Sequence, residues 1–493
     1  MDLKPMRLLL SVVLAACAAH GATLRGTVLE NQSGRPLSRA QVVLEPLDDG
    51  AAQPLTARAS ASGSFEFSSV PGGAYMITVS RRGFATMQYG QKRWKAAGSV
   101  LSMEESGTRF ITVRLPRLGA ISGTILDENE VGIPEHDVVA YRTGRPLQLV
   151  ARARTDDRGR YRLSGLEPGK YLVRTVAKEF EEGGYLPTYY PQGQRADQAY
   201  AIDADLDQET PEINLHPALG RLVAVSGQVS PAAAVSVSLV SDMGAETIVA
   251  DASGNFQFGA TAPGPYEIYA QGPGDARGGV QAAYLSILLD RDRSDIRLAL
   301  RPLPQIQFVI KDARGANVDL RSVWVMARRK DLAGIAKTQA LALSGDRLAF
   351  LPGRWEIALF PPAGSYVSSV SSRADGWREF ILTAATETLQ AVLSSTPGEV
   401  RGRVIGPGNL PAAGAPVYLE AFDPVSHRRL RDPQTTRSNA AGQYRFPDLA
   451  PGTYRLLSSA DLEPPDGTFE ARARTIRVEE SSQTEQDLEF TER

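Results

Sequence analysis

The chain has 493 residues, a length that favours about three to five domains. Its 42% hydrophobic and 22% charged residues are typical of a folded globular protein and exclude a largely disordered one. The 54 lysines and arginines nearly balance the 56 acidic residues, and no long basic block occurs, so we exclude nucleic acid as a partner.

The N-terminal segment, residues 1–22, resembles a secretory signal peptide. Basic residues precede an apolar run, Leu8–Ala16, that is too short to be a permanent transmembrane anchor. Cys17, the only cysteine, follows Leu-Ala-Ala and resembles the lipidated cysteine of a bacterial lipobox. The alternative is ordinary cleavage near residues 19–21, which would discard it. We expect an exported protein in the periplasm or at the cell surface, with a lipid on Cys17 as its only membrane attachment.

One pattern recurs along the rest of the chain: a glycine followed two residues later by an aromatic residue, and then a Pro-Gly that precedes a second aromatic residue. The first part occurs at Gly63/Phe65, Gly159/Tyr161, Gly254/Phe256 and Gly442/Tyr444. The second part ends at Tyr75, Tyr171, Tyr266, Trp355 and Tyr454.

The Pro-Gly pairs predict β-hairpins with type II turns, because proline fixes φ at the second turn position and glycine supplies the positive φ needed next. Side chains alternate after the turn, so that Tyr171 and Val173 share a face opposite to Leu172, as in a half-buried strand. We expect the aromatic residue after Pro-Gly to close the end of a hydrophobic core.

Related stretches also open the units, with glycines at Gly26, Gly123, Gly227 and Gly402, and the fourth unit starts near residue 305. The starts are roughly 80–105 residues apart, the size of an antiparallel sandwich of about seven strands. We therefore predict an all-β protein of tandem antiparallel β-sandwiches, Ig-like or prealbumin-like, in an elongated array. The predicted sandwiches cover residues 23–117, 118–218, 219–303, 304–396 and 397–493, the fourth being a degraded repeat.

The second unit reads GTILDENEVGIPEHDVVAYR and then TDDRGRYRLSGLEPGKYLV, and this pattern resembles carboxypeptidase regulatory-like domains. These are prealbumin-like sandwiches, similar also to collagen-adhesin B-type repeats and starch-binding-like folds, and they occur in multi-repeat exported bacterial proteins. The resemblance covers nearly all of the chain after the signal segment and implies a fold rather than an activity. A zinc carboxypeptidase of the kind that carries such a domain needs a His-x-x-Glu pair. None of His20, His136, His216 and His427 is followed three residues later by glutamate.

The motifs of catalysis and cofactor binding are missing, so we predict that the protein is not an enzyme and that it uses no cofactor and no metal. A Gly-x-Ser-x-Gly motif does not occur, and the only cysteine lies in the signal segment. Residues 203–209 place three aspartates at alternate positions. Gln208 and Asn214 stand where an EF-hand loop needs glycine and glutamate, which favours a solvated acidic turn over a calcium site.

The candidate ligand-binding residues are Tyr185, Tyr189 and Tyr190 in an insertion of the second unit, and Tyr89 and Trp94 in an insertion of the first. Their rings, beside Gln, Arg and Lys, are suited to stack on sugar rings or to anchor a protein partner. The alternative is that they pack against a neighbouring sandwich. The sequence of the third to fifth units indicates no equivalent aromatic cluster.

These observations predict a non-catalytic, exported cell-envelope protein that binds carbohydrate or protein. A polysaccharide or an envelope protein is the expected partner. The alternative function is that of a structural spacer or interaction rod with no small ligand.

Overall fold

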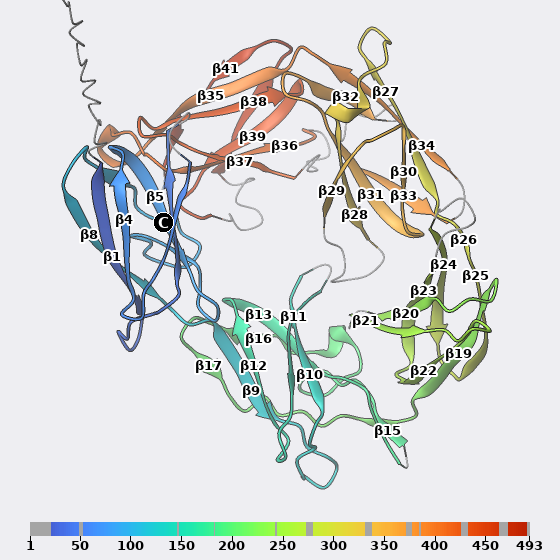
Figure 1. Ribbon diagram of the computed structural model, residues 1–493. Coiled ribbons are helices and arrows are strands. Elements are labelled where there is room, and N and C mark those ends of the chain that lie inside the picture. The colour runs from blue at the N-terminus through green and yellow to red at the C-terminus, as the bar shows by residue number, and fades with distance from the viewer. Residues whose placement is uncertain are drawn as a thin grey trace, which may run out of the picture. The chain divides into compact units, whose positions relative to one another are not determined.

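A computed structural model describes residues 21–48, 53–144, 147–181, 183–241, 244–272, 280–330, 338–370, 377–383, 386–424, 432–462 and 472–490. Cys17 and most of the predicted signal peptide lie outside these residues. The regular structure is almost entirely β-strand (Figure 1), which confirms the predicted all-β class of tandem sandwiches. Within the described ranges, no helix has the length and apolar character needed to cross a membrane.

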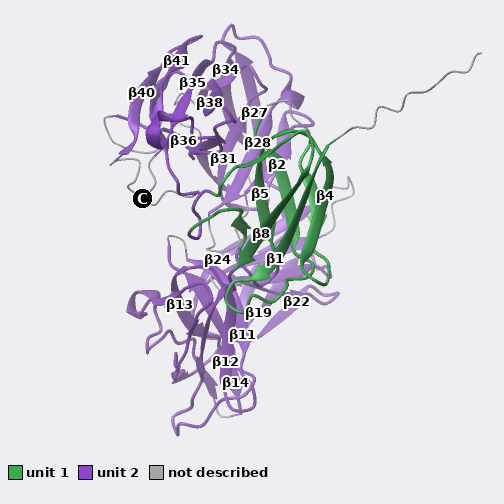
Figure 2. Ribbon diagram, turned by 90° about the vertical axis from the view of Figure 1, so that its left-hand side faces the viewer, with its two compact units in different colours: residues 1–81, 86–92, 98–115 green, residues 82–85, 93–97, 116–493 purple. Residues whose placement is uncertain are grey.

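The chain forms two compact units, coloured separately in Figure 2. The first unit comprises residues 1–81, 86–92 and 98–115, and the second comprises residues 82–85, 93–97 and 116–493. The first contains one β-sandwich, and the second contains four that follow one another along the chain.

The sandwich of the first unit has one sheet of order β4-β1-β8 and one of order β3-β2-β5-β6, in which β7 also pairs with β5. Its strands are β1 (Ala22–Glu30), β2 (Gln41–Pro46), β3 (Leu55–Arg58), β4 (Ser64–Val70), β5 (Gly73–Ser80), β6 (Met87–Gln88), β7 (Leu101–Met103) and β8 (Thr108–Leu115). Strand β1 is antiparallel to β4 and parallel to β8. Leu24, Val28, Val42 and Leu44 are fully buried between the two sheets.

The second sandwich repeats this topology with sheets β12-β9-β17 and β11-β10-β13-β16, and adds a small sheet β14-β15-β18. Its strands are β9 (Gly119–Thr124), β10 (Asp137–Arg142), β11 (Gln148–Arg154), β12 (Arg160–Leu166), β13 (Gly169–Thr175), β14 (Lys178–Phe180), β15 (Gly183–Tyr185), β16 (Ile202–Ala204), β17 (Glu209–Thr210) and β18 (Leu219–Gly220). A 3-10 turn, η1 (Ala196–Gln198), precedes β16. The first strand is again antiparallel to the fourth and parallel to a late strand.

The third sandwich has sheets β22-β19-β25 and β21-β20-β23-β24-β26. Its strands are β19 (Val223–Ser230), β20 (Ser236–Ser241), β21 (Gly244–Val249), β22 (Asn255–Thr261), β23 (Gly264–Gly272), β24 (Gln281–Leu289), β25 (Arg293–Ala299) and β26 (Arg301–Pro302). Phe256 and Phe258 of β22 pack edge to face in its core, with ring centroids 6.0 Å apart.

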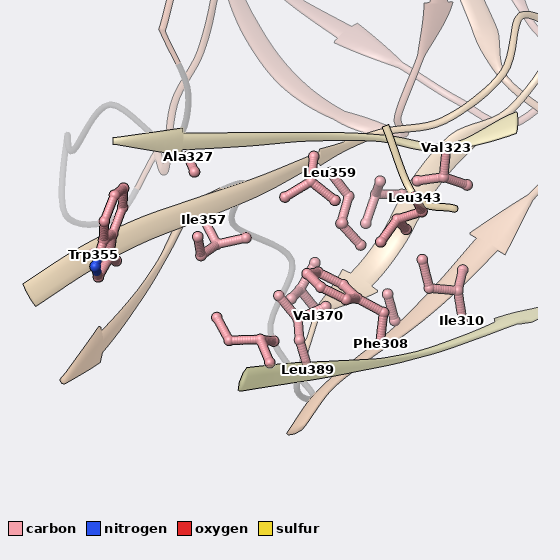
Figure 3. Packing of buried hydrophobic residues seen from close by; sticks show 14 of the residues in the cluster. Phe308, Ile310, Val323, Ala327, Leu343, Trp355, Ile357, Leu359, Val370 and Leu389 are labelled. Atoms are coloured by element: carbon pink, nitrogen blue, oxygen red, sulfur yellow. The ribbon is translucent and has the colours of Figure 1, made fainter. Parts of the chain in front are cut away.

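The fourth sandwich has sheets β30-β27-β34-β32 and β29-β28-β31-β33. Its strands are β27 (Gln305–Asp312), β28 (Trp324–Arg329), β29 (Gln339–Ala342), β30 (Arg347–Ala349), β31 (Gly353–Phe360), β32 (Tyr366–Val370), β33 (Trp377–Leu382) and β34 (Glu387–Ser394), with η2 (Leu320–Ser322) before β28. Phe308, Ile357 and Leu389 meet between the sheets, and Trp355 lies at one end of this core (Figure 3).

The fifth sandwich has sheets β38-β35-β41, to which β42 adds, and β37-β36-β39-β40. Its strands are β35 (Gly398–Ile405), β36 (Pro416–Ala421), β37 (Gln434–Arg437), β38 (Gln443–Leu449), β39 (Gly452–Ser458), β40 (Arg474–Val478), β41 (Gln483–Glu485) and β42 (Leu488–Glu489), with η3 (Pro407–Asn409) after β35. The first strand, β35, is antiparallel to β38 and parallel to β41 and β42.

The opening glycine of a unit and the aromatic residue of its Gly-x-aromatic segment are cross-strand neighbours. The pairs are Gly26 with Phe65, Gly123 with Tyr161, Gly227 with Phe256 and Gly402 with Tyr444. A Cβ atom on Gly26 would lie 2.3 Å from Phe65 Cζ, so only glycine leaves room for the ring. In the second sandwich the Tyr161 hydroxyl donates to the Ile213 carbonyl at 2.5 Å. The two parts of the repeat therefore serve one packing arrangement.

The Pro-Gly segments do not form the predicted hairpins, because the strands on either side of each belong to different sheets. The φ of Gly169 is 156°, far from the value of about 80° in a type II turn. Crossing between sheets lets Leu163 of β12 and Val173 of β13 meet in one core, whereas a hairpin would leave them side by side. The ring after Pro-Gly does close the core: the Tyr171 hydroxyl donates to the Glu167 carbonyl at 2.6 Å.

Candidate binding site on the second sandwich

The insertion of the second sandwich, residues 178–200, covers the outer face of one of its own sheets. Strand side chains alternate, so Val138 and Ala140 face the core while Val139 and Tyr141 face outward. Tyr189 of the insertion packs on this outward pair. The insertion therefore buries a sheet face that the strands alone would expose.

Tyr189 holds the insertion on the sheet through a ring contact and a cation. The side chain is only 2% exposed, and its ring centroid lies 6.4 Å from that of Tyr141. The Arg174 guanidinium lies 5.2 Å from the Tyr189 ring and 5.7 Å from the Tyr141 ring, and its Nη1 donates to the Tyr189 hydroxyl at 3.3 Å. A guanidinium that is shielded from water strengthens such cation–π contacts.

The other two candidate tyrosines also face their own sandwich. Tyr185 and Tyr190 both pack against its core. The Tyr185 ring lies 4.9 Å from Phe180, and burial raises the pKa of its hydroxyl. The structure thus brings all three predicted tyrosines into one insertion, but it turns their rings inward. Tyr200, at the end of the insertion, is 67% exposed.

A polar pocket of about 650 Å³ lies beside the insertion. Its polar lining is formed by Thr188, Gln192, Gln194, Arg195, Gln198 and His216. The loop keeps its shape partly through Gln198, whose Oε1 accepts from the Gln194 backbone N–H at 3.2 Å. Arg195 pairs with Asp197 at 2.8 Å, and this pairing lowers the pKa of the aspartate. Carboxamides that both donate and accept hydrogen bonds dominate this surface.

A larger groove of about 860 Å³ runs along the same loop. Gln194 and Arg195 line this groove as well as the polar pocket, and Arg152 and Tyr189 contribute to the same wall. The other wall comes from the third sandwich, around Tyr266. The loop from Gln192 to Gln198 is therefore accessible from two sides.

The two candidate residues of the first sandwich belong to different compact units. Tyr89, in the first unit, is half-buried, and its backbone N–H donates to the Ile77 carbonyl at 2.9 Å. Trp94, in the second unit, is half-buried too, and the Lys95 ammonium lies 4.5 Å from its ring centroid.

The acidic segment after residue 203 acts in hydrogen bonding within the sandwich. Asp207 Oδ1 accepts from the Arg117 backbone N–H at 2.6 Å, and Asp203 pairs with Lys170 at 2.8 Å. Among the residues that the structure describes, no three His, Cys, Asp or Glu side chains gather in a way that could hold a metal ion.

His136 lies beneath the insertion and is fully buried. Its Nε2 is 2.7 Å from the Val176 carbonyl, while its Nδ1 has no hydrogen-bond partner in the described part of the chain. Burial lowers the pKa of this imidazole; the nearby Lys178 acts in the same direction, and the bond to Val176 and the Asp137 carboxylate oppose it. Burial therefore favours the neutral form of the ring.

This lowered pKa predicts that the second sandwich loses stability as the pH falls below about 6.5, the ordinary value for histidine. Below this pH the unfolded chain binds a proton on the histidine, whereas the folded chain does not, so acid favours unfolding. Above this pH the contribution of His136 to stability is fully present.

Urea denaturation between pH 8 and pH 5 should show a weaker pH dependence in His136→Gln than in the natural protein. The control is Gln208→Ala, which replaces an exposed, non-titrating side chain of the same sandwich and should leave the dependence unchanged. A His136→Gln profile identical to that of the natural protein would contradict the prediction.

One family model and several solved structures are similar to this chain. The model of the carboxypeptidase regulatory-like domain matches residues 23–101 and 120–203. No curated protein matches the sequence. Among solved structures, the chain is similar to the minor pilin GBS52 of Streptococcus agalactiae, with 16% identity, a TM-score of 0.25, and coverage of 40% of this chain and 95% of that chain. It is also similar to a streptococcal ancillary pilin, with 12% identity, a TM-score of 0.19, and coverage of 54% and 98% of the two chains. The second family match includes the whole insertion.

Proposed function

We propose that this chain, whose residues 23–101 and 120–203 are carboxypeptidase regulatory-like domains, is a non-catalytic exported protein of the cell envelope that binds polysaccharide through the second sandwich. The observation that carries this proposal is the polar pocket beside the loop from Gln192 to Gln198. Each sugar hydroxyl both donates and accepts a hydrogen bond, and so does each glutamine carboxamide. Three glutamines with an arginine and a histidine therefore suit a polyhydroxylated ligand.

In this proposal the inward-facing tyrosines hold the binding loop in place and do not contact the sugar. Binding residues are commonly carried on loops that a rigid scaffold positions. Tyr189 and Arg174 fix the loop to the sheet without any ligand, so its exposed polar side chains are already ordered when a sugar arrives. Replacing the tyrosines would thus test packing, whereas replacing the exposed polar side chains tests binding.

The proposal predicts that Gln194→Ala/Arg195→Ala weakens polysaccharide binding by at least about tenfold. Both side chains are exposed and line both hollows, and each lost hydrogen bond to a sugar hydroxyl costs about 1 kcal/mol. The purified protein would first be screened against glycans and cell-wall polysaccharides, and the dissociation constant for any hit would be compared between the natural protein and the variant by calorimetry.

The matched control is Gln208→Ala/Arg158→Ala, which removes the same two residue types from exposed positions of the same sandwich. This control should bind as the natural protein does. Equal binding by both variants would move the polysaccharide site away from the pocket. If no glycan is bound at all, the proposal fails and a structural spacer becomes the better description of the chain; the support for that alternative is that the insertion packs on its own sandwich.

A further inference from the structure

An exposed aromatic pair lies on the outer face of one sheet of the fourth sandwich. Trp324 of β28 is directly opposite Phe360 of β31, and the two side chains are 52% and 53% exposed. Both point away from the core, because the neighbouring Val325 and Leu359 point into it. The equivalent cross-strand pairs of the first and third sandwiches are Gln41 with Ser80 and Ser236 with Gln271. The aromatic pair is thus a feature of the fourth sandwich rather than of the repeat.

The aromatic face continues along the sheet. Met326, two residues after Trp324, lies opposite Ala358, and Ala358 lies opposite Trp377 of β33. On the other side, Trp324 is opposite Ala342 of the edge strand β29. Because the neighbouring side chains of Ala342 and Ala358 are small, the aromatic rings project above the sheet. We call the surface formed by Trp324, Met326, Phe360 and Trp377 the aromatic strip.

Charged groups border the strip, and their charges compensate one another. Arg328 Nε donates to Glu356 at 2.5 Å, and Lys330 Nζ donates to the same carboxylate at 2.7 Å. Arg328 also pairs with Asp432 at 3.3 Å, so two cations meet two carboxylates. The Arg328 guanidinium also lies 4.0 Å from the Trp377 ring. Four residues of extended strand separate Trp324 from Arg328, which is about 13 Å. The strip is therefore apolar at Trp324 and bordered by hydrogen-bonding groups at Arg328 and Glu356, without a strong electrostatic field of either sign.

We propose that the aromatic strip binds a linear, uncharged polysaccharide. The face of an aromatic ring carries partial negative charge, which complements the slightly positive C–H groups on the apolar face of a sugar ring. Arg328 and Lys330 are compensated by Glu356 and Asp432 and do not attract a polyanion, but the donors and acceptors of these groups match sugar hydroxyls. The length of the strip suits several linked sugar units rather than one. This site is separate from the pocket of the second sandwich and does not depend on it.

The test compares the natural protein with Trp324→Ala/Phe360→Ala in native gels that contain hydroxyethyl cellulose, xylan or dextran as the neutral polysaccharide. We expect at least one of them to retard the natural protein, and we expect the double variant to lose at least about tenfold in affinity. Both side chains are half-exposed, so their removal should leave the fold intact, which circular dichroism would verify. The control Ile381→Ala removes an apolar side chain that is 65% exposed on the same sheet, beyond the strip, and should change nothing.

Two further measurements distinguish binding at the strip from binding at the pocket of the second sandwich and from self-association. In a Trp94→Phe background, acrylamide quenching should report Trp324 and Trp377 of the strip, because Trp355 is buried, and binding should reduce that quenching. The pocket variant Gln194→Ala/Arg195→Ala should keep its retardation by a polysaccharide that the strip binds. The inference is overturned if no neutral polysaccharide retards the natural protein, or if the double variant is retarded equally. It is also overturned if the double variant instead abolishes a concentration-dependent self-association seen by sedimentation, because the strip would then be a protein interface.

Discussion

Gly227→Ala is expected to lower the free energy of unfolding of the third sandwich by about 3 kcal/mol. A Cβ atom at this position would lie 2.2 Å from the Ile296 carbonyl oxygen and 2.8 Å from Phe256 Cζ. Neither Ile296 nor Phe256 can move away easily to make room for this atom. Ile296 belongs to the paired strand β25, and Phe256 is buried in the core. Strand β19 would have to move away from both of its partners in the sheet, so the variant should strain hydrogen bonding and packing together.

The matched control for this substitution is Gly259→Ala in the same sandwich. A Cβ atom on Gly259 would meet nothing within 4 Å, so this variant should lose no stability and gain a few tenths of a kcal/mol from a less flexible unfolded chain. Urea denaturation of the full chain, followed by hydrogen exchange of the amides between residues 223 and 302, assigns the change to the third sandwich. Equal protection in the two variants would show that the opening glycine is not required for packing.

The sequence predicts the sandwiches well because their repeated residues act on one another directly. The opening glycine and the later aromatic residue, such as Gly123 and Tyr161, are far apart in the chain but adjacent across two strands. The glycine and the aromatic residue therefore recur together in the repeats, because the ring packs in the space that the glycine leaves. The Pro-Gly turn was predicted wrongly because its local chemistry fits both a hairpin and a crossing between sheets. Only the position of the core, shared by Leu163 and Val173, decides between the two.

The insertion of the second sandwich could be found from its composition, but the direction of its side chains could not. The ring of Tyr189 is buried because Tyr141 and Arg174 stand on the outer face of the sheet below it. No local signal reveals that face, since the sequence of β10 and β13 is equally compatible with a solvated surface. His216 joins the polar pocket from beyond the insertion, and only the path of the chain after β17 brings it there.

The sequence indicates no aromatic insertion after the second unit, and the aromatic strip of the fourth sandwich is of another kind, because strand residues form it. Trp324, Phe360 and Trp377 are scattered along the chain, but they occupy neighbouring strands in the order β28-β31-β33. Cross-strand pairing then places Trp324 opposite Phe360. A search for aromatic residues at alternate, outward positions of paired strands would have found them; a search for local clusters cannot.

Arg455→Met is expected to lower the free energy of unfolding of the fifth sandwich by about 3–5 kcal/mol. Arg455 lies directly opposite Glu420, and the two side chains are 11% and 3% exposed, with 3.6 Å between their closest nitrogen and oxygen atoms. The guanidinium also lies 4.2 Å from the Phe422 ring. Removing the arginine takes away a cation that pairs with a buried carboxylate, and the folded state then holds this charge away from water with less compensation.

Two further variants decide whether the charge is responsible for this loss. Glu420→Leu/Arg455→Met removes both charges and should recover most of the stability in urea denaturation, because no charge is then buried. In the fourth sandwich, Arg328 and Glu356 face each other at the equivalent positions with the charges exchanged, and their side chains are 32% and 15% exposed. Arg328→Met should cost only about 1 kcal/mol, since water reaches this pair and Lys330 still binds the carboxylate. A double variant as unstable as Arg455→Met alone would instead attribute the loss to the packing of the arginine on Phe422, because that contact is missing from both variants.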